Sequence, residues 1–161
     1  MDFKTTVTDL SAITLRDSQW RNSKYQALKE CSTTQKGDWA ENLLCKLLSA
    51  KGLAATIHNH GRGGYDVEAP RQRTEVKLAT QDVGGKFQFN GIDLERDFDA
   101  GFLLGVTPNE LFFLYLSKCD LHPKLYTGFS KWTLHPMQLV SLTEENFWAS
   151  WTALNLCKKV H

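Results

Sequence analysis

Residues 63–80 have the sequence GGYDVEAPRQRTEVKLAT. Two short runs that favour β-structure, residues 65–69 and 74–79, are separated by Pro70 and three polar residues. This pattern predicts a β-hairpin. A glycine-rich segment, residues 59–64, precedes the hairpin and allows the backbone to turn sharply.

Three charged side chains of this hairpin are predicted to lie together. Side chains alternate between the faces of a strand, so Glu75 and Lys77 share a face, and Asp66 joins them if the charged faces of the two strands coincide. Two adjacent carboxylates repel each other unless a cation neutralises them, and oxygen ligands favour Mg²⁺ or Mn²⁺. A lysine beside such a site can orient a water molecule toward a phosphorus atom. The alternative is an amphipathic hairpin that turns its charges to water.

The flanking patterns predict an α/β (α+β) fold. Apolar residues at helical spacing predict a helix over residues 38–51 that ends before Gly52 and packs one face on a sheet. The other predicted elements are a helix over residues 20–30, a break at 31–34, strands over 53–57, 101–106 and 111–116, and a closing helix from a Ser141-x-x-Glu144 capping box to about residue 156, with Phe147, Trp148, Trp151 and Leu154 inward. We expect one domain, residues 1–161, with a mixed sheet of about five strands flanked by helices.

The composition narrows the possible partners. The 161 residues carry a net charge of +1, so a surface that binds a polyanion would have to be local. Residues 16–86 are the basic part, with 12 Lys and Arg against 8 Asp and Glu. The first residues lack the pattern of a secretory signal, and no apolar run approaches the ~20 residues of a membrane helix. We expect an intracellular, cytoplasmic protein without a membrane partner, whose four scattered cysteines are reduced.

Three segments resemble the PD-(D/E)xK nuclease superfamily, the restriction-endonuclease-like enzymes that include Holliday junction resolvases and repair nucleases. They are KGDWAENLLCKLLSAKG at residues 36–52, GGYDVEA at 63–69 and TEVKLAT at 74–80. FLLGVTPNELFFLYL, residues 102–116, suits the remaining core strands. The resemblance implies a restriction-endonuclease-like core. One departure is Tyr65, which stands where the family name has proline, at a position that varies across the superfamily.

The resemblance implies roles for five residues. Asp66 and Glu75 match the metal-binding carboxylates, and Val76 would lend its backbone carbonyl to the same ion, Mg²⁺ with Mn²⁺ as a possible substitute. Lys77 matches the catalytic lysine, and Glu41 matches the acidic residue of the first helix. On a helical wheel Glu41 borders the apolar face, so it either looks into the cleft or faces solvent.

Polar residues around the hairpin are candidates for DNA contacts. Lys and Arg can meet phosphate or guanine, and Gln and Asn can read adenine edges. The candidates are Arg62, Arg71, Arg73, Lys86, Gln88 and Asn90, each of which is alternatively an ordinary surface residue. His58 and His60 spell H-N-H with the residue between them, but the nuclease motif of that name is not made of adjacent residues. The glycine-rich segment lacks Gly-Lys-Ser/Thr, so no nucleotide cofactor is expected.

These observations lead to three hypotheses. The first is a Mg²⁺-dependent DNA endonuclease of restriction type, which hydrolyses phosphodiesters and works as a homodimer because a duplex has two strands. The second is a structure-specific nuclease, such as a junction resolvase or a repair enzyme, with the same catalytic residues. The third is a non-catalytic nucleic-acid-binding module that keeps the fold and the charged hairpin. Cleavage assays on plain and branched DNA, with and without metal, separate the three.

Overall fold

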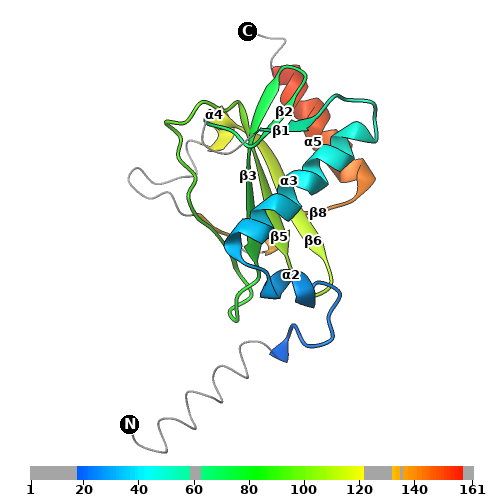
Figure 1. Ribbon diagram of the computed structural model, residues 1–161, viewed down its shortest axis with the longest axis vertical. Helices are drawn as coiled ribbons and strands as arrows, with labels where there is room; N and C mark the ends of the chain where they lie inside the picture. The colour runs from blue at the N-terminus through cyan, green and yellow to red at the C-terminus, as the bar shows by residue number, and fades with distance from the viewer. Residues whose placement is uncertain (1–17, 59–62, 122–131, 135, 158–161) are drawn as a thin grey trace, which may run out of the picture.

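The computed structural model describes residues 18–58, 63–121, 132–134 and 136–157 (Figure 1). Its centre is a six-stranded sheet in which β3 and β5 are parallel and the other neighbouring strands are antiparallel. In spatial order the strands are β1 (Thr56–Ile57), β2 (Val67–Ala69), β3 (Gln72–Thr80), β5 (Ala100–Val106), β6 (Leu111–Ser117) and β8 (Val140–Ser141). The prediction of a mixed sheet flanked by helices is confirmed, with six strands in place of about five.

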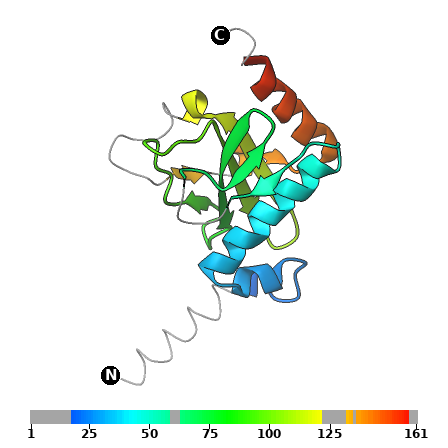
Figure 2. The same ribbon diagram turned by 45° about the horizontal axis from the view of Figure 1, so that its top comes forward.

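Two helices cover one face of this sheet. They are α3 (Thr33–Ser49) and α5 (Glu144–Cys157), which meet at one end (Figure 2). Leu44 of α3 and Phe147 of α5 belong to the same buried cluster as Phe102 of β5. Apolar burial of this kind is the main favourable contribution to folding. None of the helices in the described part of the chain is long and apolar enough to cross a membrane.

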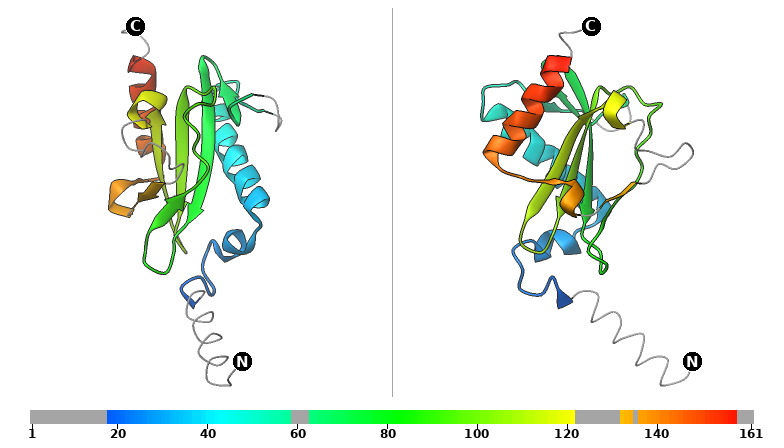
Figure 3. Two further views of the ribbon diagram at one scale, coloured as in Figure 1. Left: turned by 90° about the vertical axis from the view of Figure 1, so that its left-hand side faces the viewer. Right: turned by 180° about the vertical axis from the view of Figure 1, so that it is seen from behind.

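The opposite face is covered by a second, smaller sheet. β4 (Phe87–Phe89) pairs with β7 (Trp132–Leu134), and both strands join a second buried cluster with residues of β5, β6 and α4 (Lys118–Leu121). Phe87 and Phe89 are fully buried in it because residues two apart on a strand share a face. Figure 3 shows α3 on one side of the central sheet and the β7 segment on the other.

β3 extends well beyond β2, and this difference in length creates the site. β2 pairs only with residues 72–74 of β3, whereas β5 pairs with residues 74–80. Among the described residues, the edge of β3 that faces away from β5 therefore has no strand partner beyond this short hairpin. Backbone N–H and C=O groups on such an edge need other partners.

The N-terminal part of the fold differs from its prediction. The helix expected over residues 20–30 is limited to α2 (Gln26–Glu30). Asn22 has a left-handed φ of 58°, which a right-handed helix does not accommodate. The Tyr25 N–H donates to Pro108 O across the fold instead of to a helical carbonyl. Tertiary contacts thus replace the first turns of the expected helix.

Helix α3 begins at Thr33, earlier than the predicted start at residue 38. Ser32 Oγ accepts a hydrogen bond from the Gln35 N–H at 3.2 Å, and Gln35 Oε1 accepts one from the Ser32 N–H at 2.9 Å. This capping box places the first turn of the helix inside the segment 31–34 that the sequence indicated as a break. The helix ends at Ser49, two residues before the predicted end at residue 51, and Gly52 follows in the turn with a φ of +79° that suits glycine.

The hairpin and the C-terminal elements match the predicted order, with local differences. β2 and β3 are joined by a two-residue turn, in which Arg71 has a φ of 63°. The strand expected over residues 53–57 is limited to β1. The closing helix is present, but its cap is Thr143, whose Oγ1 accepts a hydrogen bond from the Asn146 N–H at 3.1 Å. Ser141, the predicted cap, belongs to β8 instead.

Candidate active site

A cleft of about 650 Å³ runs along the unpaired edge of β3. Five consecutive residues of the strand, 76–80, line it. Neighbouring side chains of a strand point to opposite faces, so a cleft lined by consecutive residues follows the edge of the strand. The other lining residues are Asp66, Gln88, Asn90 and Arg96, with Thr33, Thr34, Lys36, Gly37, Asp38 and Glu41 on α3.

Glu75 lies beneath the cleft, on the face of β3 opposite to Val76 and α3. Its side chain is only 1% exposed. Lys77 Nζ lies 2.7 Å from Glu75 Oε1, and Arg96 Nη1 lies 3.3 Å from the same oxygen. Glu75 Oε2 is buried and has no hydrogen-bond partner among the described residues. A buried polar atom without a partner costs free energy, so this oxygen is a place where a cation would be favoured.

The charge state of Glu75 reflects these surroundings. Burial raises the pKa of Glu75 above its ordinary value, and the negative charge of Asp66 adds to the rise. The hydrogen bond and the charge of Lys77, and to a lesser degree the charge of Arg96, act in the opposite direction. Because the net shift is upward, the two cations do not fully offset the cost of burying the carboxylate.

The register of the hairpin brings Asp66 beside Glu75. Extending the pairing of β2 and β3 by one residue places the two opposite each other, and the Asp66 N–H donates to Thr74 O at 2.9 Å. Asp66 Oδ2 accepts a hydrogen bond from the Val76 N–H at 2.8 Å. The Asp66 carboxylate thereby satisfies one backbone group of the open edge of β3. The structure thus brings together Asp66, Glu75 and Lys77, the trio that the sequence indicated.

Glu41 reaches the cleft from α3. It is 5% exposed and lines the cleft, so it does not face solvent. Asp38 lies three residues earlier on the same helix face and lines the cleft as well. Burial, together with the charge of Glu41, raises the pKa of Cys45 one turn further along the helix. The spacing of Asp38 and Glu41 is a sequence signal that could have indicated Asp38 as a site residue.

The oxygen atoms at this site suit an ion such as Mg²⁺, which needs few protein ligands, better than an ion that must be enclosed by protein ligands. In the part of the chain that the structure describes, no three His, Cys, Asp or Glu side chains are placed to hold a metal ion together. Mg²⁺ does not need such a cage, because it is usually held by one or two carboxylates while waters and substrate phosphates complete its shell. Glu75 Oε2 lacks a partner, and Asp66 lies close enough to raise the pKa of Glu75. The Val76 carbonyl is on the same strand.

Two of the predicted DNA-contacting residues lie in the cleft. They are Gln88 and Asn90, and Gln88 Nε2 donates to Asn90 Oδ1 at 3.1 Å. Lys86 precedes them on the chain but does not line the cleft. His58 is also not among the lining residues, and His60 lies outside the described residues.

The two predicted arginines that the structure describes, Arg71 and Arg73, are not among the residues that line the cleft. Arg71 is exposed on the hairpin turn. Arg73 is held by two carboxylates, with Nη1 2.5 Å from Asp97 Oδ2 and Nε 3.4 Å from Asp99 Oδ2. Arg62 lies outside the described residues. Arg73 therefore holds residues 97–99 against β3 through these ion pairs.

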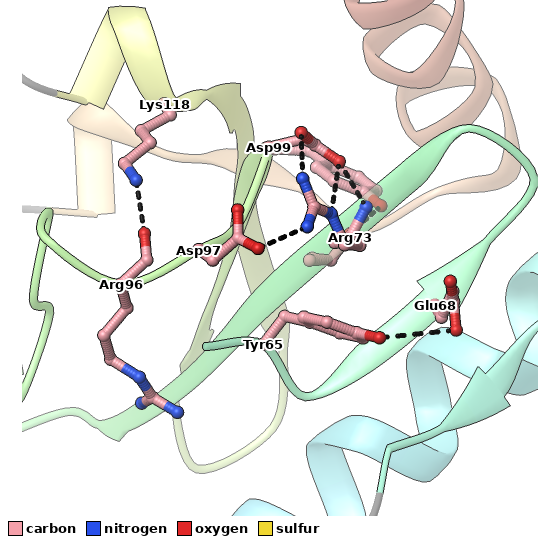
Figure 4. A network of polar contacts seen from close by, with 9 residues as sticks. Tyr65, Glu68, Arg73, Arg96, Asp97, Asp99 and Lys118 are labelled. Atoms are coloured by element: carbon pink, nitrogen blue, oxygen red, sulfur yellow. Dashed lines mark hydrogen bonds and ion pairs between the residues drawn. The ribbon is translucent and has the colours of Figure 1, made fainter. Parts of the chain in front are cut away.

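Arg96 is a further site residue that the sequence did not indicate. Its contact with Glu75 spans 21 residues of chain, so no local pattern indicates it. Residues 96–99 are fastened at two points, where Lys118 Nζ donates to Arg96 O and where Arg73 pairs with carboxylates of the same segment (Figure 4). Figure 4 also shows the Arg96 side chain extending away from Lys118. The segment thereby presents a guanidinium to the site.

Gly64 allows this segment to approach the start of the hairpin. A Cβ on Gly64 would lie 2.2 Å from Asp97 N and 3.0 Å from Arg96 C, both of which are backbone atoms. We therefore expect Gly64→Ala to lower the free energy of unfolding by about 1–3 kcal/mol through overpacking. Gly37→Ala is the matched control, because a Cβ there meets no atom within 4 Å and alanine is the better helix former. Chemical denaturation measures both variants, and a Gly64→Ala protein as stable as wild type would contradict this close approach.

Of the comparisons with known proteins, the one with solved structures found a similar chain. The sequence matches no protein-family profile, and no curated protein is similar to it. Among solved structures, the chain is similar to the bacterial homing endonuclease I-Ssp6803I, with a TM-score of 0.45 and 17% sequence identity over 65% of this chain and 75% of that chain.

Proposed function

We propose that the protein is a Mg²⁺-dependent DNA endonuclease of the PD-(D/E)xK type. The observation that carries the proposal is the buried carboxylate of Glu75, which has one unpartnered oxygen and lies beside Asp66 and Lys77 at a cleft. An amphipathic hairpin with no further role would leave such charges in water, where ion pairs contribute little. Titratable groups with perturbed pKa values cluster at functional sites, and Glu75 is one of them.

The residues of the site can divide the work of phosphodiester hydrolysis. Asp66 and Glu75, with the Val76 carbonyl, would hold the ion, which supplies Lewis acidity at the phosphate oxygens and lowers the pKa of the attacking water. Lys77 is held at 2.7 Å by Glu75, and its ammonium can orient the water and stabilise the charge that develops on the phosphate. Glu41 enters the same cleft, where it can bind a second ion or orient the first.

The walls of the cleft suit a DNA backbone and its bases. Helix α3 begins at the cleft, and the macrodipole favours phosphate at a helix N-terminus. Lys36 adds a positive charge on the same wall. Gln88 and Asn90 carry amide groups of the kind that read base edges. We propose a restriction-type enzyme that acts on duplex DNA as a homodimer, with one cleft for each strand.

Cleavage of defined DNA substrates tests the proposed function. The purified protein is incubated with plasmid DNA, phage-genome DNA and four-way junctions, in Mg²⁺, Mn²⁺ or EDTA. Discrete duplex fragments that require metal support the restriction type. Cutting of junctions alone would replace that type with a structure-specific nuclease. Intact DNA under every condition would contradict the nuclease proposal and favour a non-catalytic binding module.

A further inference from the structure

A single oxygen of Glu75 holds two cations. Oε1 lies 2.7 Å from Lys77 Nζ and 3.3 Å from Arg96 Nη1, while Oε2 has no hydrogen-bond partner among the described residues. Lys77 is two residues further along the same strand, so strand geometry alone brings it to this face. Arg96 comes from a separate segment that the rest of the fold must hold in place.

The fold fixes the backbone of this segment but not the end of the Arg96 side chain. Lys118 holds the Arg96 carbonyl, and Arg73 holds the two carboxylates that follow (Figure 4). Gly64 permits the close backbone approach. The Arg96 side chain is 37% exposed, the residue lines the cleft, and Nη2 makes a second contact with Gly63 O at 3.4 Å. Its contacts are long, so it can change partner while the segment stays in place.

The four charged groups that meet around Glu75 balance one another only in the absence of a metal ion, while Asp38 and Glu41 add negative charge and Lys36 adds positive charge elsewhere in the cleft. Asp66 and Glu75 are negative, and Lys77 and Arg96 are positive. A divalent ion on the two carboxylates would bring an excess of two positive charges and would compete with both cations for Glu75. Of the two, Arg96 is the more distant from Oε1 and the more exposed, at 37% against 24% for Lys77. A phosphate is the natural second partner for a planar guanidinium.

We propose that Arg96 is an exchangeable counter-ion of Glu75. It neutralises the carboxylate while no divalent ion is bound, and it contacts a phosphate of the nucleic acid when the carboxylate is engaged by the ion. This inference rests on the proposed nuclease function, because it takes the phosphate from the substrate of the same cleft. It makes ion binding and DNA binding cooperative through one side chain.

Arg96→Ala tests the exchange through two affinities that do not require cleavage. In isothermal titration with Mn²⁺ and no DNA, we expect the variant to bind the ion about 2- to 5-fold more tightly than wild type, because a competing cation of a partly exposed pair has been removed. In fluorescence anisotropy with a labelled duplex, we expect Ca²⁺ to strengthen DNA binding about 10-fold less in the variant than in wild type. Arg96→Lys keeps the charge, and we expect both its Mn²⁺ affinity and its Ca²⁺ effect on DNA binding to lie between those of wild type and Arg96→Ala.

Controls separate this exchange from a loss of structure. Lys51→Ala removes a positive charge beyond the other end of α3, away from the cleft, and is expected to change neither affinity. If Arg96→Ala does not fold, Arg96→Gln, which retains a donor for Gly63 O, is measured in its place. Weaker Mn²⁺ binding in the folded variant, or an unchanged effect of Ca²⁺ on DNA affinity, would overturn the proposal.

The same measurements distinguish the inference from the proposed function. A wild-type protein that binds neither Mn²⁺ nor Ca²⁺ overturns both. A wild-type protein that cuts DNA while Arg96→Ala lacks the two affinity changes overturns the exchange alone. Tighter Mn²⁺ binding and weaker coupling in Arg96→Ala, in a protein that cuts no DNA, would support the exchange and contradict the nuclease.

Discussion

Lys77→Ala is expected to slow DNA cleavage by about 10²- to 10³-fold, the usual effect of removing one preorganised charge from a site of transition-state stabilisation. Lys77 Nζ is fixed at 2.7 Å from a carboxylate that is 1% exposed, so its position is set before substrate arrives. Single-turnover cleavage in saturating Mg²⁺ measures the effect. The DNA affinity should change little, because one contact among many is lost.

The interpretation of this variant requires a matched charge deletion. Lys51→Ala also removes one lysine, at a position ion-paired with Glu144 and away from the cleft. We expect Lys51→Ala to cut at the wild-type rate. Cleavage by Lys77→Ala at the wild-type rate would show that the ammonium beside Glu75 has no part in the reaction.

Glu75→Gln is expected to have opposite effects on activity and stability. Cleavage should fall at least 10³-fold, because a principal ligand of the ion is lost. At neutral pH and in EDTA, however, the variant should be more stable than wild type, with a Tm higher by a few degrees. The reason is that burial raises the pKa of Glu75, so the folded state disfavours the ionised carboxylate, and a neutral amide of the same shape avoids this cost.

The sign of this effect follows from proton linkage. A folded-state pKa above the ordinary value of 4.5 means that the folded protein binds the Glu75 proton more tightly than the unfolded chain. The stability that the protonated Glu75 carboxyl contributes is therefore fully present below pH 4.5. It is lost as the pH rises through the folded-state pKa of Glu75. The stability difference between Glu75→Gln and wild type should be present at pH 7.5 and small at pH 4.

Mg²⁺ should reverse the order of stability. A wild-type protein that binds the ion gains about 1.4 kcal/mol when the free ion is at ten times its Kd, and the variant gains little. Denaturation curves with and without Mg²⁺, at both pH values, measure this. If Glu75→Gln is less stable than wild type at pH 7.5 in EDTA, the ion pairs with Lys77 and Arg96 outweigh the cost of burial.

The local parts of the site could be predicted from the sequence because they depend on strand periodicity. Alternation along β3 placed Glu75 and Lys77 on one face. The register that brings Asp66 opposite Glu75 comes from a two-residue turn, shorter than the four residues expected between the strands. The burial of Glu75 could not be predicted in this way. The chain that covers its face of the sheet includes residues 87–98, which contribute Phe87, Phe89, Ile92 and Phe98 to the second buried cluster and also carry Arg96. An isolated hairpin would show these charges to water.

The errors in the predicted fold also have tertiary causes. The helix expected over residues 20–30 is shortened by the left-handed Asn22 and by the hydrogen bond from Tyr25 to Pro108. A local pattern carries no information about a partner more than 80 residues away. The earlier start of α3, by contrast, has a local cause, because Ser32 and Gln35 have the spacing of a capping box. This signal was present in the sequence.

We propose that the cleft along the open edge of β3 hydrolyses phosphodiester bonds through its carboxylates. Asp66→Asn tests it most directly, since asparagine retains an oxygen that can accept the Val76 N–H hydrogen bond while the negative charge is removed. The measurement is the initial rate of plasmid nicking in Mg²⁺ and in EDTA, for wild type, Asp66→Asn and Lys51→Ala. We expect Mg²⁺-dependent nicking by wild type and Lys51→Ala, and none by Asp66→Asn. Equal nicking by Asp66→Asn, or nicking by wild type in EDTA, would contradict it.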